Sequence, residues 1–256
     1  MKVEPQRIIS RDNALLVRLR KLAQDPGGYR KLGEVWLEGD HLCAALLARG
    51  GHPAHSVVTE SAWDEPRLRV LAMAADRVAL VPDALFKSFS GLESPARLGF
   101  VLAHGASADI VAGVAAVVLD RLQDAGNVGS ILRSAAALGF GQVIALKGTA
   151  ALWSPKVLRA GMGAHFALHL VESASVDSLD ALKLPFVATS SHAKQALGEI
   201  ALPRPCAWVF GHEGQGVDAD LLERCALTVR IPQPGGEESL NVAAAAAICL
   251  YESVRQ

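Results

Sequence analysis

The strongest constraint on the fold is an alternation of short apolar runs with helical segments after about residue 113. The runs VAAVVL (114–119), QVIAL (142–146) and AWVFG (207–211) contain no charged residue. A strand that is apolar on both faces has to be buried on both faces, which is typical of parallel strands covered by helices on each side. The pattern predicts a doubly wound α/β domain with a parallel sheet over residues 113–256.

The part of the chain before this domain has the pattern of a second, smaller α/β module. Short apolar runs at 35–37 and 56–59 flank a helical segment at 41–48 that two glycines close. The segment 104–112 is small, polar and without periodicity, and we therefore predict a linker there. The expected organisation is a module at 1–103, a linker at 104–112 and the parallel-sheet domain at 113–256.

Charge is distributed unevenly along the chain. Residues 1–31 hold eight basic and three acidic side chains, a net +5 in a chain whose total is −1, so the remainder carries −6. Within this stretch, NALLVRLRKLAQ predicts a helix with three leucines on one face and its basic side chains off that face. Such a helix is either a solvated amphipathic helix or one that faces phosphates. The total net charge of −1 excludes a protein that coats nucleic acid broadly, because phosphate affinity needs clustered Lys and Arg.

Cysteine usage and hydropathy predict a protein without disulfides, metal sites or membrane-spanning segments. The four cysteines form no CxxC pair, and the eight histidines are scattered, so we expect neither disulfides nor a metal site. The most apolar stretches are too short to cross a bilayer, and residues 1–13 lack the apolar core of a signal peptide. A cytoplasmic location is expected.

Three loops should meet where a parallel sheet binds its ligands, beyond the carboxyl ends of the strands. The first follows the run 114–119 and contains Asn127, before a helix that we expect to open at Ser130 and to place Arg133 near its mouth. The fingerprint GxGxxG of dinucleotide-binding proteins is absent, which argues against a nucleotide-dependent oxidoreductase.

The second and third loops also carry glycines and polar residues that a plain connection would not need. VFGHEGQGV holds three glycines within six positions around Glu213, as expected of a backbone that turns sharply or lies against a ligand. IPQPGGEESLNV combines prolines, glycines and a Glu pair with Ser239 and Asn241, either of which could cap the helix predicted after it. Tight turning in the second loop and capping in the third remain open as purely structural explanations.

These motifs, in this order, resemble the SpoU/TrmH family of RNA 2′-O-ribose methyltransferases of the SPOUT class. The three matching segments have the forms N-x-G-x-x-x-R, G-x-E-G-x-G and I-P-…-S-L-N-V, and they are carried by Asn127, Gly129 and Arg133, by Gly211, Glu213, Gly214 and Gly216, and by Ile231, Pro232, Ser239, Leu240, Asn241 and Val242. Upstream, residues 1–103 resemble the N-terminal substrate-binding domain of the longer members. The one departure is Ala125, where many members have Pro.

The resemblance implies a fold, a cofactor and an assembly. It implies a C-terminal SPOUT domain with a trefoil knot, transfer of a methyl group from S-adenosylmethionine to a ribose 2′-hydroxyl, and a homodimer with active sites at the subunit interface. Gly211, Ile231 and Leu240 would contact the cofactor. The implied polar catalytic site consists of Asn127, Arg133, Glu213, Ser239 and Asn241.

The implied substrate is RNA, and its identity is the least determined feature. A large-subunit ribosomal guanosine is the first choice because of the N-terminal domain, and a transfer RNA is the alternative. A non-catalytic RNA-binding protein would keep the basic N-terminus but could lose motif residues, and here all are present. Arg133 is expected to clamp phosphate and stabilise developing negative charge, since a guanidinium stays protonated in proteins.

Overall fold

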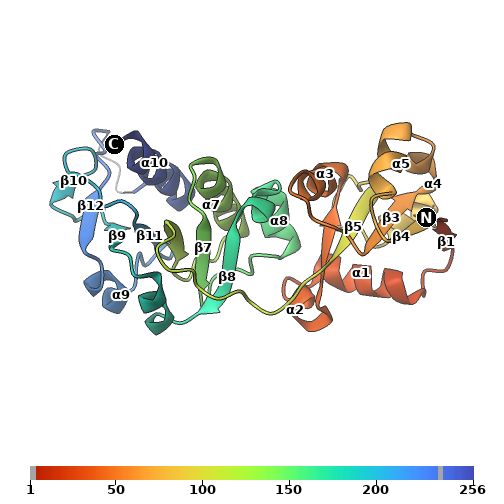
Figure 1. Ribbon diagram of the computed structural model, residues 1–256, viewed down its shortest axis with the longest axis horizontal. Coiled ribbons are helices and arrows are strands. Elements are labelled where there is room, and N and C mark those ends of the chain that lie inside the picture. The colour runs from red at the N-terminus through yellow and green to blue at the C-terminus, as the bar shows by residue number, and fades with distance from the viewer. Residues whose placement is uncertain (1–3, 236–238) are drawn as a thin grey trace. The chain divides into compact units, whose positions relative to one another are not determined.

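The computed structural model describes residues 4–235 and 239–256, so Gly236, Glu237 and Glu238 of the third loop and Lys2 of the basic stretch lie outside the described residues. The chain forms two compact units, Met1–Ala106 with Trp153–Phe166, and Ser107–Leu152 with Ala167–Gln256 (Figure 1). The second unit is thus interrupted by a segment that belongs to the first, a feature that the division by sequence did not anticipate.

The first unit is built on a mixed five-stranded sheet with strand order β1-β4-β3-β5-β2. The first three of these run parallel, and β5 is antiparallel to both β3 and β2. The strands are β1 (Gln6–Arg7), β2 (Glu34–Glu38), β3 (His55–Thr59), β4 (Arg77–Val81) and β5 (Leu98–Ala103). The helices are α1 (Ala14–Gln24), α2 (Gly28–Leu32), α3 (Asp40–Ala48), α4 (Glu60–Trp63), α5 (Pro66–Ala72), α6 (Asp83–Lys87) and α8 (Pro155–Gly161), which the 3₁₀ turn η1 (Ala164–Ala167) follows.

The basic amphipathic helix predicted near the N-terminus is α1. The side chain of Asn13 caps it by accepting a hydrogen bond from the N–H of Leu15 at 3.0 Å. Leu16 and Leu19 are fully buried, whereas Lys21 is exposed. The leucine spacing therefore fixes the buried face and leaves the basic side chains toward solvent.

The second unit is built on a seven-stranded sheet with strand order β10-β12-β9-β11-β6-β7-β8. Every pairing in it is parallel, which confirms the predicted parallel-sheet architecture. The strands are β6 (Ala116–Leu119), β7 (Gln142–Leu146), β8 (His169–Ala174), β9 (Phe186–Thr189), β10 (Gln195–Ala196), β11 (Ala207–Phe210) and β12 (Leu227–Arg230). The helices are α7 (Ala125–Ala137), η2 (Asp177–Leu182), α9 (Ala219–Glu223) and α10 (Val242–Arg255).

Helical segments cover both faces of this sheet, as the apolar strands require. On one face, η2 and α9 contribute buried leucines to a core shared with alternate residues of the strands, such as Val118, Ile144 and Val209. On the other face α7 and α10 pack side by side (Figure 1). There the indole N–H of Trp208 donates to the hydroxyl of Ser253 in α10 at 2.7 Å, so both polar groups are satisfied in the core.

The expected start of the first site helix was wrong. Helix α7 begins at Ala125, and Asp124 caps it by accepting from the N–H of Asn127 at 2.7 Å. Ser130 therefore lies inside the helix, and Arg133 is its ninth residue, about 12 Å along the axis from the first at 1.5 Å per residue. Both Asp and Ser are favourable N-caps, and the earlier one also has a hydrogen-bond partner in place.

Two further observations concern membrane helices and metal sites. Among the residues that the structure describes, no helix has both the length and the apolar character needed to cross a membrane. In the same residues, no three His, Cys, Asp or Glu side chains are grouped so that they could hold a metal ion. The trefoil knot stays a prediction.

Candidate active site

The three motif loops follow β6, β11 and β12 at the carboxyl ends of a parallel sheet. β11 pairs directly with β6, and β9 lies between β11 and β12. Because all these strands run in one direction, their carboxyl ends share one edge of the sheet. Residues that lie 86 to 114 positions apart in the sequence therefore form hydrogen bonds with each other at this edge.

Glu213 joins the second loop to the first. Its carboxylate accepts hydrogen bonds from the N–H of Gln123 at 3.1 Å, from the N–H of Asp124 at 3.0 Å and from the side-chain amide of Asn127 at 3.1 Å. The two N–H groups belong to the turn just before α7, where backbone donors have no helical partner. Glu213 thus ties the glycine-rich loop to the start of this helix.

These donors also determine the charge state of Glu213. Partial desolvation acts to raise its pKa, but the hydrogen bonds from the N–H of Gln123, from its own N–H, from the Asn127 amide and from the N–H of Asp124 outweigh it. The result is a pKa lowered to about 2. Glu213 is therefore an anion at neutral pH and a weak base, which suits positioning better than proton removal.

Asn127 connects all three motifs. Its amide group donates to Glu213, and its carbonyl Oδ1 accepts from the Nδ2 group of Asn241 at 2.9 Å. Asn241 in turn caps α10, because its Oδ1 accepts from the N–H of Ala243 at 2.9 Å and of Ala244 at 3.2 Å. Each amide is thereby oriented unambiguously: reversing either would place two donors or two acceptors against each other.

Gly211 has a structural reason to be glycine. A Cβ at this position would lie 2.1 Å from both the carbonyl carbon of Gly216 and the nitrogen of Val217. The loop returns on itself here, since the N–H of Gly216 donates to the carbonyl of His212 at 2.8 Å and Gly216 has a φ of +71°. Tight turning, which the sequence left open, accounts for Gly211 and Gly216. It leaves the exposed Gly214 unexplained.

The remaining predicted site residues are not drawn into this cluster. Arg133 is exposed on α7 and makes no hydrogen bond or ion pair with any described residue. Ser239 and Leu240 are exposed in the third loop, Leu240 by 40%, and Ile231 is half-buried at the start of that loop. The structure therefore unites Asn127, Glu213 and Asn241 and leaves Arg133, Ser239 and Leu240 open to solvent.

Sequence reasoning missed three polar residues at this edge. Asp120 is buried at the end of β6, where it accepts from Arg121 at 2.9 and 3.0 Å and from the N–H of Asp218 at 2.8 Å, so it holds the two loop bases together. Gln123 supplies one of the N–H groups that bind Glu213. The side-chain oxygen of Gln233 is buried and has no partner among the described residues. A charged residue directly after an apolar strand was the available signal for Asp120.

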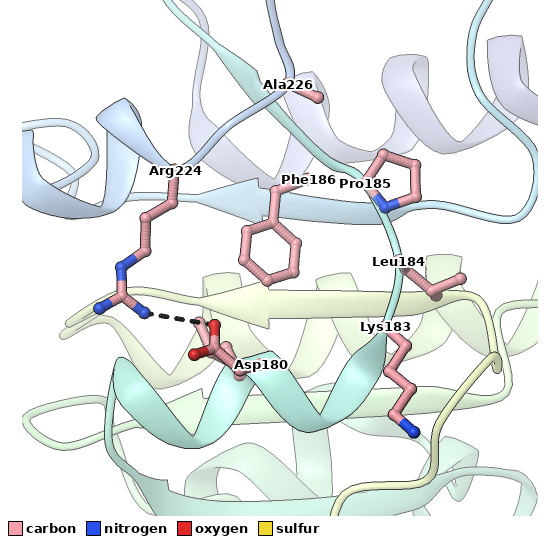
Figure 2. Close-up of a pocket in the computed structure, with 8 residues that line it drawn as sticks. Asp180, Lys183, Leu184, Pro185, Phe186, Arg224 and Ala226 are labelled. Carbon is pink, nitrogen blue, oxygen red and sulfur yellow. Dashed lines mark ion pairs between the residues drawn. The ribbon is translucent and has the colours of Figure 1, made fainter.

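A hollow lies at the opposite end of the same sheet from the motif loops. It has a volume of about 360 Å³ and opens beside Pro185 and Phe186, where β9 begins. Figure 2 shows the guanidinium of Arg224 directed at the carboxylate of Asp180 across this hollow, with a separation of 3.6 Å. Arg224 also binds Asp177 at 2.7 Å, so its charge is neutralised within the fold. None of the motif residues lines it.

Comparison with known proteins agrees with the geometry. Residues 115–251 match the SpoU rRNA methylase family. Over 97% of its length the chain is 35% identical to an uncharacterized tRNA/rRNA methyltransferase of Synechocystis, of which it covers 93%. It is 32% identical to the 23S rRNA (guanosine(2553)-2′-O)-methyltransferase RlmP of Bacillus subtilis over 86% of this chain and 88% of the other. The solved SpoU methyltransferase AviRb of Streptomyces viridochromogenes, in complex with AdoMet, superimposes with a TM-score of 0.85 at 25% identity over 95% of this chain and 98% of that chain.

A parallel sheet with three polar loops at its carboxyl edge, in a chain that superimposes on an AdoMet-bound SpoU methyltransferase, defines an RNA methyltransferase that uses S-adenosylmethionine. The chain belongs to the SpoU rRNA methylase family. The predicted activity, methyl transfer from S-adenosylmethionine to a ribose 2′-hydroxyl of RNA, is thereby confirmed.

Proposed function

We propose that the RNA methylated by this enzyme is ribosomal, with a guanosine of the large subunit as the first choice and a transfer RNA as the alternative. The similarity to a 23S rRNA guanosine methyltransferase over most of both chains supports this target. A second relative, 28% identical, is a 23S rRNA uridine 2′-O-methyltransferase, so the base differs among relatives while the RNA is the same. In such an enzyme residues 1–103 bind the substrate, and its place of action is the cytoplasm.

The observation that carries the site assignment is the hydrogen-bonded series Asn241–Asn127–Glu213. Glu213 is the positioning member, because its low pKa and its three donors make it an anchor for Asn127. Asn127 and Asn241 each have a second N–H that these contacts do not use. We assign those donors to the substrate ribose and Ser239, which lies beside Asn241 in sequence, to the same polar site.

The residues of the third loop fit S-adenosylmethionine. A buried acceptor without a donor costs about 1–3 kcal/mol, and the side-chain oxygen of Gln233 is such an acceptor among the described residues. The amino groups of the cofactor are donors of the required kind. Ile231 and Leu240 add apolar surface, and Gly211 can offer only main chain. When bound, S-adenosylmethionine supplies a methyl group on a cationic sulfur that the 2′-oxygen attacks.

Arg133 then acts on the substrate as a fixed positive charge. The 2′-hydroxyl gains negative character as its oxygen attacks and its proton leaves, and a nearby guanidinium stabilises that charge. The same group can bind a phosphate through two parallel hydrogen bonds. Because Arg133 has no partner among the described residues, it is free to make these contacts.

Arg133→Lys tests this role. Lysine keeps the charge but loses the planar fork, so we expect methyl transfer to fall by about tenfold to a hundredfold, within the range given by loss of charge-assisted hydrogen bonds of about 1.5–3 kcal/mol. The measurement is the single-turnover rate as a function of pH. Near-full activity with an unchanged pH profile would contradict a bidentate clamp. Binding of S-adenosylmethionine, followed by calorimetry, serves as the control and should not change.

We propose further that the enzyme is a homodimer whose interface includes α10. Ile248, Tyr251 and Val254 lie within one side of this helix and are exposed by 41%, 57% and 47%. Clustered apolar side chains of this size on one helix face are typical of an interface. A second copy fits because the family resemblance implies dimers with shared active sites.

Two measurements test the proposed function as a whole. Calorimetry should show binding of S-adenosylmethionine and none of NAD. Mapping of 2′-O-methyl groups in total RNA from a deletion strain should show one lost position in ribosomal RNA, restored by the wild-type gene and not by the Asn127→Ala variant. Loss confined to transfer RNA would favour the alternative target, and unchanged methylation in both RNAs would contradict the proposal.

A further inference from the structure

The first unit contains a groove that the methyl-transfer site does not use. Its volume is about 510 Å³, within the range of ligand sites in proteins. It lies where β3 and β4 begin, next to β1 and the start of α1.

The floor of this groove is apolar and its rim is polar. Ile8, Leu15 and Ala79 are each at most 9% exposed. Gln6 pairs with Ala79 and His55 with Arg77, and because side chains alternate along a strand, these four lie on one face of the sheet. An apolar surface edged by hydrogen-bonding groups suits a flat heterocycle.

The charges on the rim are balanced. Arg18 is held by Glu34 at 3.1 Å, and Asp76 is held by His52 at 2.7 Å. Arg77 is exposed and has no ion pair with any described residue, so it is the cation left for a ligand. The two lining arginines are matched by the two lining carboxylates, Glu4 and Asp76, so the groove as a whole does not select a bare phosphate.

His55 presents a neutral imidazole to the groove. Burial lowers its pKa, and the positive charges of Arg77 and Arg18 lower it further, against smaller opposing effects of Glu34 and Asp76. At neutral pH the ring therefore offers one donor and one acceptor nitrogen. Gln6, also on the rim, offers both kinds of group as well. This set matches the edge of a nucleobase, which also mixes donors and acceptors.

We propose that this groove binds an unpaired nucleotide of the RNA substrate, with its base on the apolar floor, His55 and Gln6 at the base edge and Arg77 at the neighbouring phosphodiester. The inference rests on the proposed function, since the ligand is part of the methylated RNA. Proteins recognise RNA mainly through unpaired bases held in such sites, because the major groove of an RNA duplex is closed to side chains. The groove would fix the RNA at a second point, remote in sequence from the motifs.

The test is a binding titration of the full-length enzyme with short fluorescent oligoribonucleotides of each base over a series of salt concentrations. For His55→Ala we expect affinity to fall about threefold to tenfold, the effect of one lost hydrogen bond, with an unchanged salt dependence. For Arg77→Gln we expect weaker binding and a salt slope smaller by about 0.7, the value for one phosphate contact on a single strand. Arg49→Gln is the matched control, because Arg49 is exposed in the same unit and does not line the groove.

The outcomes separate this inference from the proposed function. Binding by both groove variants equal to that of Arg49→Gln would overturn the inference, as would failure of the wild type to bind any of the oligonucleotides. Mononucleotides that bind as tightly as the oligonucleotides would assign the groove to a free nucleotide and also overturn it. In each case intact S-adenosylmethionine binding and methylation would leave the proposed function standing. Circular dichroism melting of each variant verifies that it folds.

Discussion

At the scale of single residues, Glu213 shows how one carboxylate can join two loops that are far apart in the sequence. All three of its partners lie on the loop and helix that follow β6, whereas Glu213 itself follows β11. Its carboxylate therefore connects the loop after β11 to the loop and helix after β6. Protonation of Glu213 takes one acceptor oxygen away from these donors and so weakens the connection between the loops.

The low pKa of Glu213 gives a prediction with a definite sign. Because its folded pKa of about 2 lies below the ordinary glutamate pKa of 4.5, its contribution to stability is fully present above pH 4.5 and is lost as the pH falls toward 2. We expect Glu213→Gln to be less stable than the wild type at pH 7 by about 1 kcal/mol or less, since solvent screens an exposed carboxylate. Urea unfolding at several pH values should show the difference vanish in acid.

The control for this prediction is Glu223→Gln, because Glu223 is exposed and makes none of these hydrogen bonds. It should match the wild type at every pH. A difference between Glu213→Gln and the wild type that grows as the pH falls would show that the carboxylate is not the group that holds the loops.

Gly211 and Gly214 form a matched pair within one loop. A Cβ on Gly211 would lie 2.1 Å from backbone atoms, whereas one on Gly214 would come no closer than 3.9 Å, to the ring of His212. We expect Gly211→Ala to cost about 1–3 kcal/mol or more, the range for overpacking, and Gly214→Ala to stay within about 0.5 kcal/mol. Thermal unfolding of both variants decides the matter. Equal melting temperatures would mean that the loop is not closed as described.

At the scale of elements, Asn241 has two tasks that can be separated. Its Oδ1 caps α10, and its Nδ2 group orients Asn127. Capping alone would explain an Asn before a helix, and the sequence could not distinguish the two tasks. The amide that donates to a second loop is what connects this helix terminus to the site.

Two substitutions at Asn241 separate these tasks. Asn241→Asp keeps the capping oxygen and places a negative charge at a helix N-terminus, so stability should change by less than about 0.5 kcal/mol. It removes the donor to Asn127, and methyl transfer should therefore fall at least about tenfold, the equivalent of about 1.4 kcal/mol. Asn241→Ala should lose activity and also about 1 kcal/mol of stability. Full activity of Asn241→Asp would reduce Asn241 to a cap.

The elements also show what the sequence could and could not predict. The strands β6, β7 and β11 could be predicted, because a strand buried on both faces appears in the sequence as a continuous apolar run. The start of α7 does not follow from the sequence. Asp124 and Ser130 are both adequate N-caps in one loop, and only tertiary contacts select between them. The same holds for the site: its residue types were predictable from the motifs, but the hydrogen bonds between them depend on strand order, which no local pattern encodes.

At the scale of the whole molecule, the basic N-terminal stretch is less positive than its composition indicates. Arg7 pairs with Glu60 at 2.7 Å, Arg18 with Glu34 at 3.1 Å and Lys31 with Asp25 at 3.3 Å. These pairs use carboxylates from inside and outside the stretch. Whether the helix in this stretch faces phosphates, one of the two explanations that the sequence leaves open, thus depends on the cations that keep no acidic neighbour.

Dimerisation itself is tested by a charge placed on the exposed side of α10. Tyr251 is 57% exposed there, and an aspartate in its place would have to be desolvated in any interface that covers the helix. We expect the wild type to have about twice the chain mass of 26.9 kDa in light scattering and Tyr251→Asp to shift toward the monomer, with a loss of methyl transfer if the sites are shared. Val70→Asp is the control, because Val70 is also an apolar side chain, 74% exposed on α5, which belongs to the other compact unit. It should remain dimeric and active. A Tyr251→Asp variant that dimerises as well as Val70→Asp would place the interface elsewhere, and a monomeric wild type would contradict the dimer.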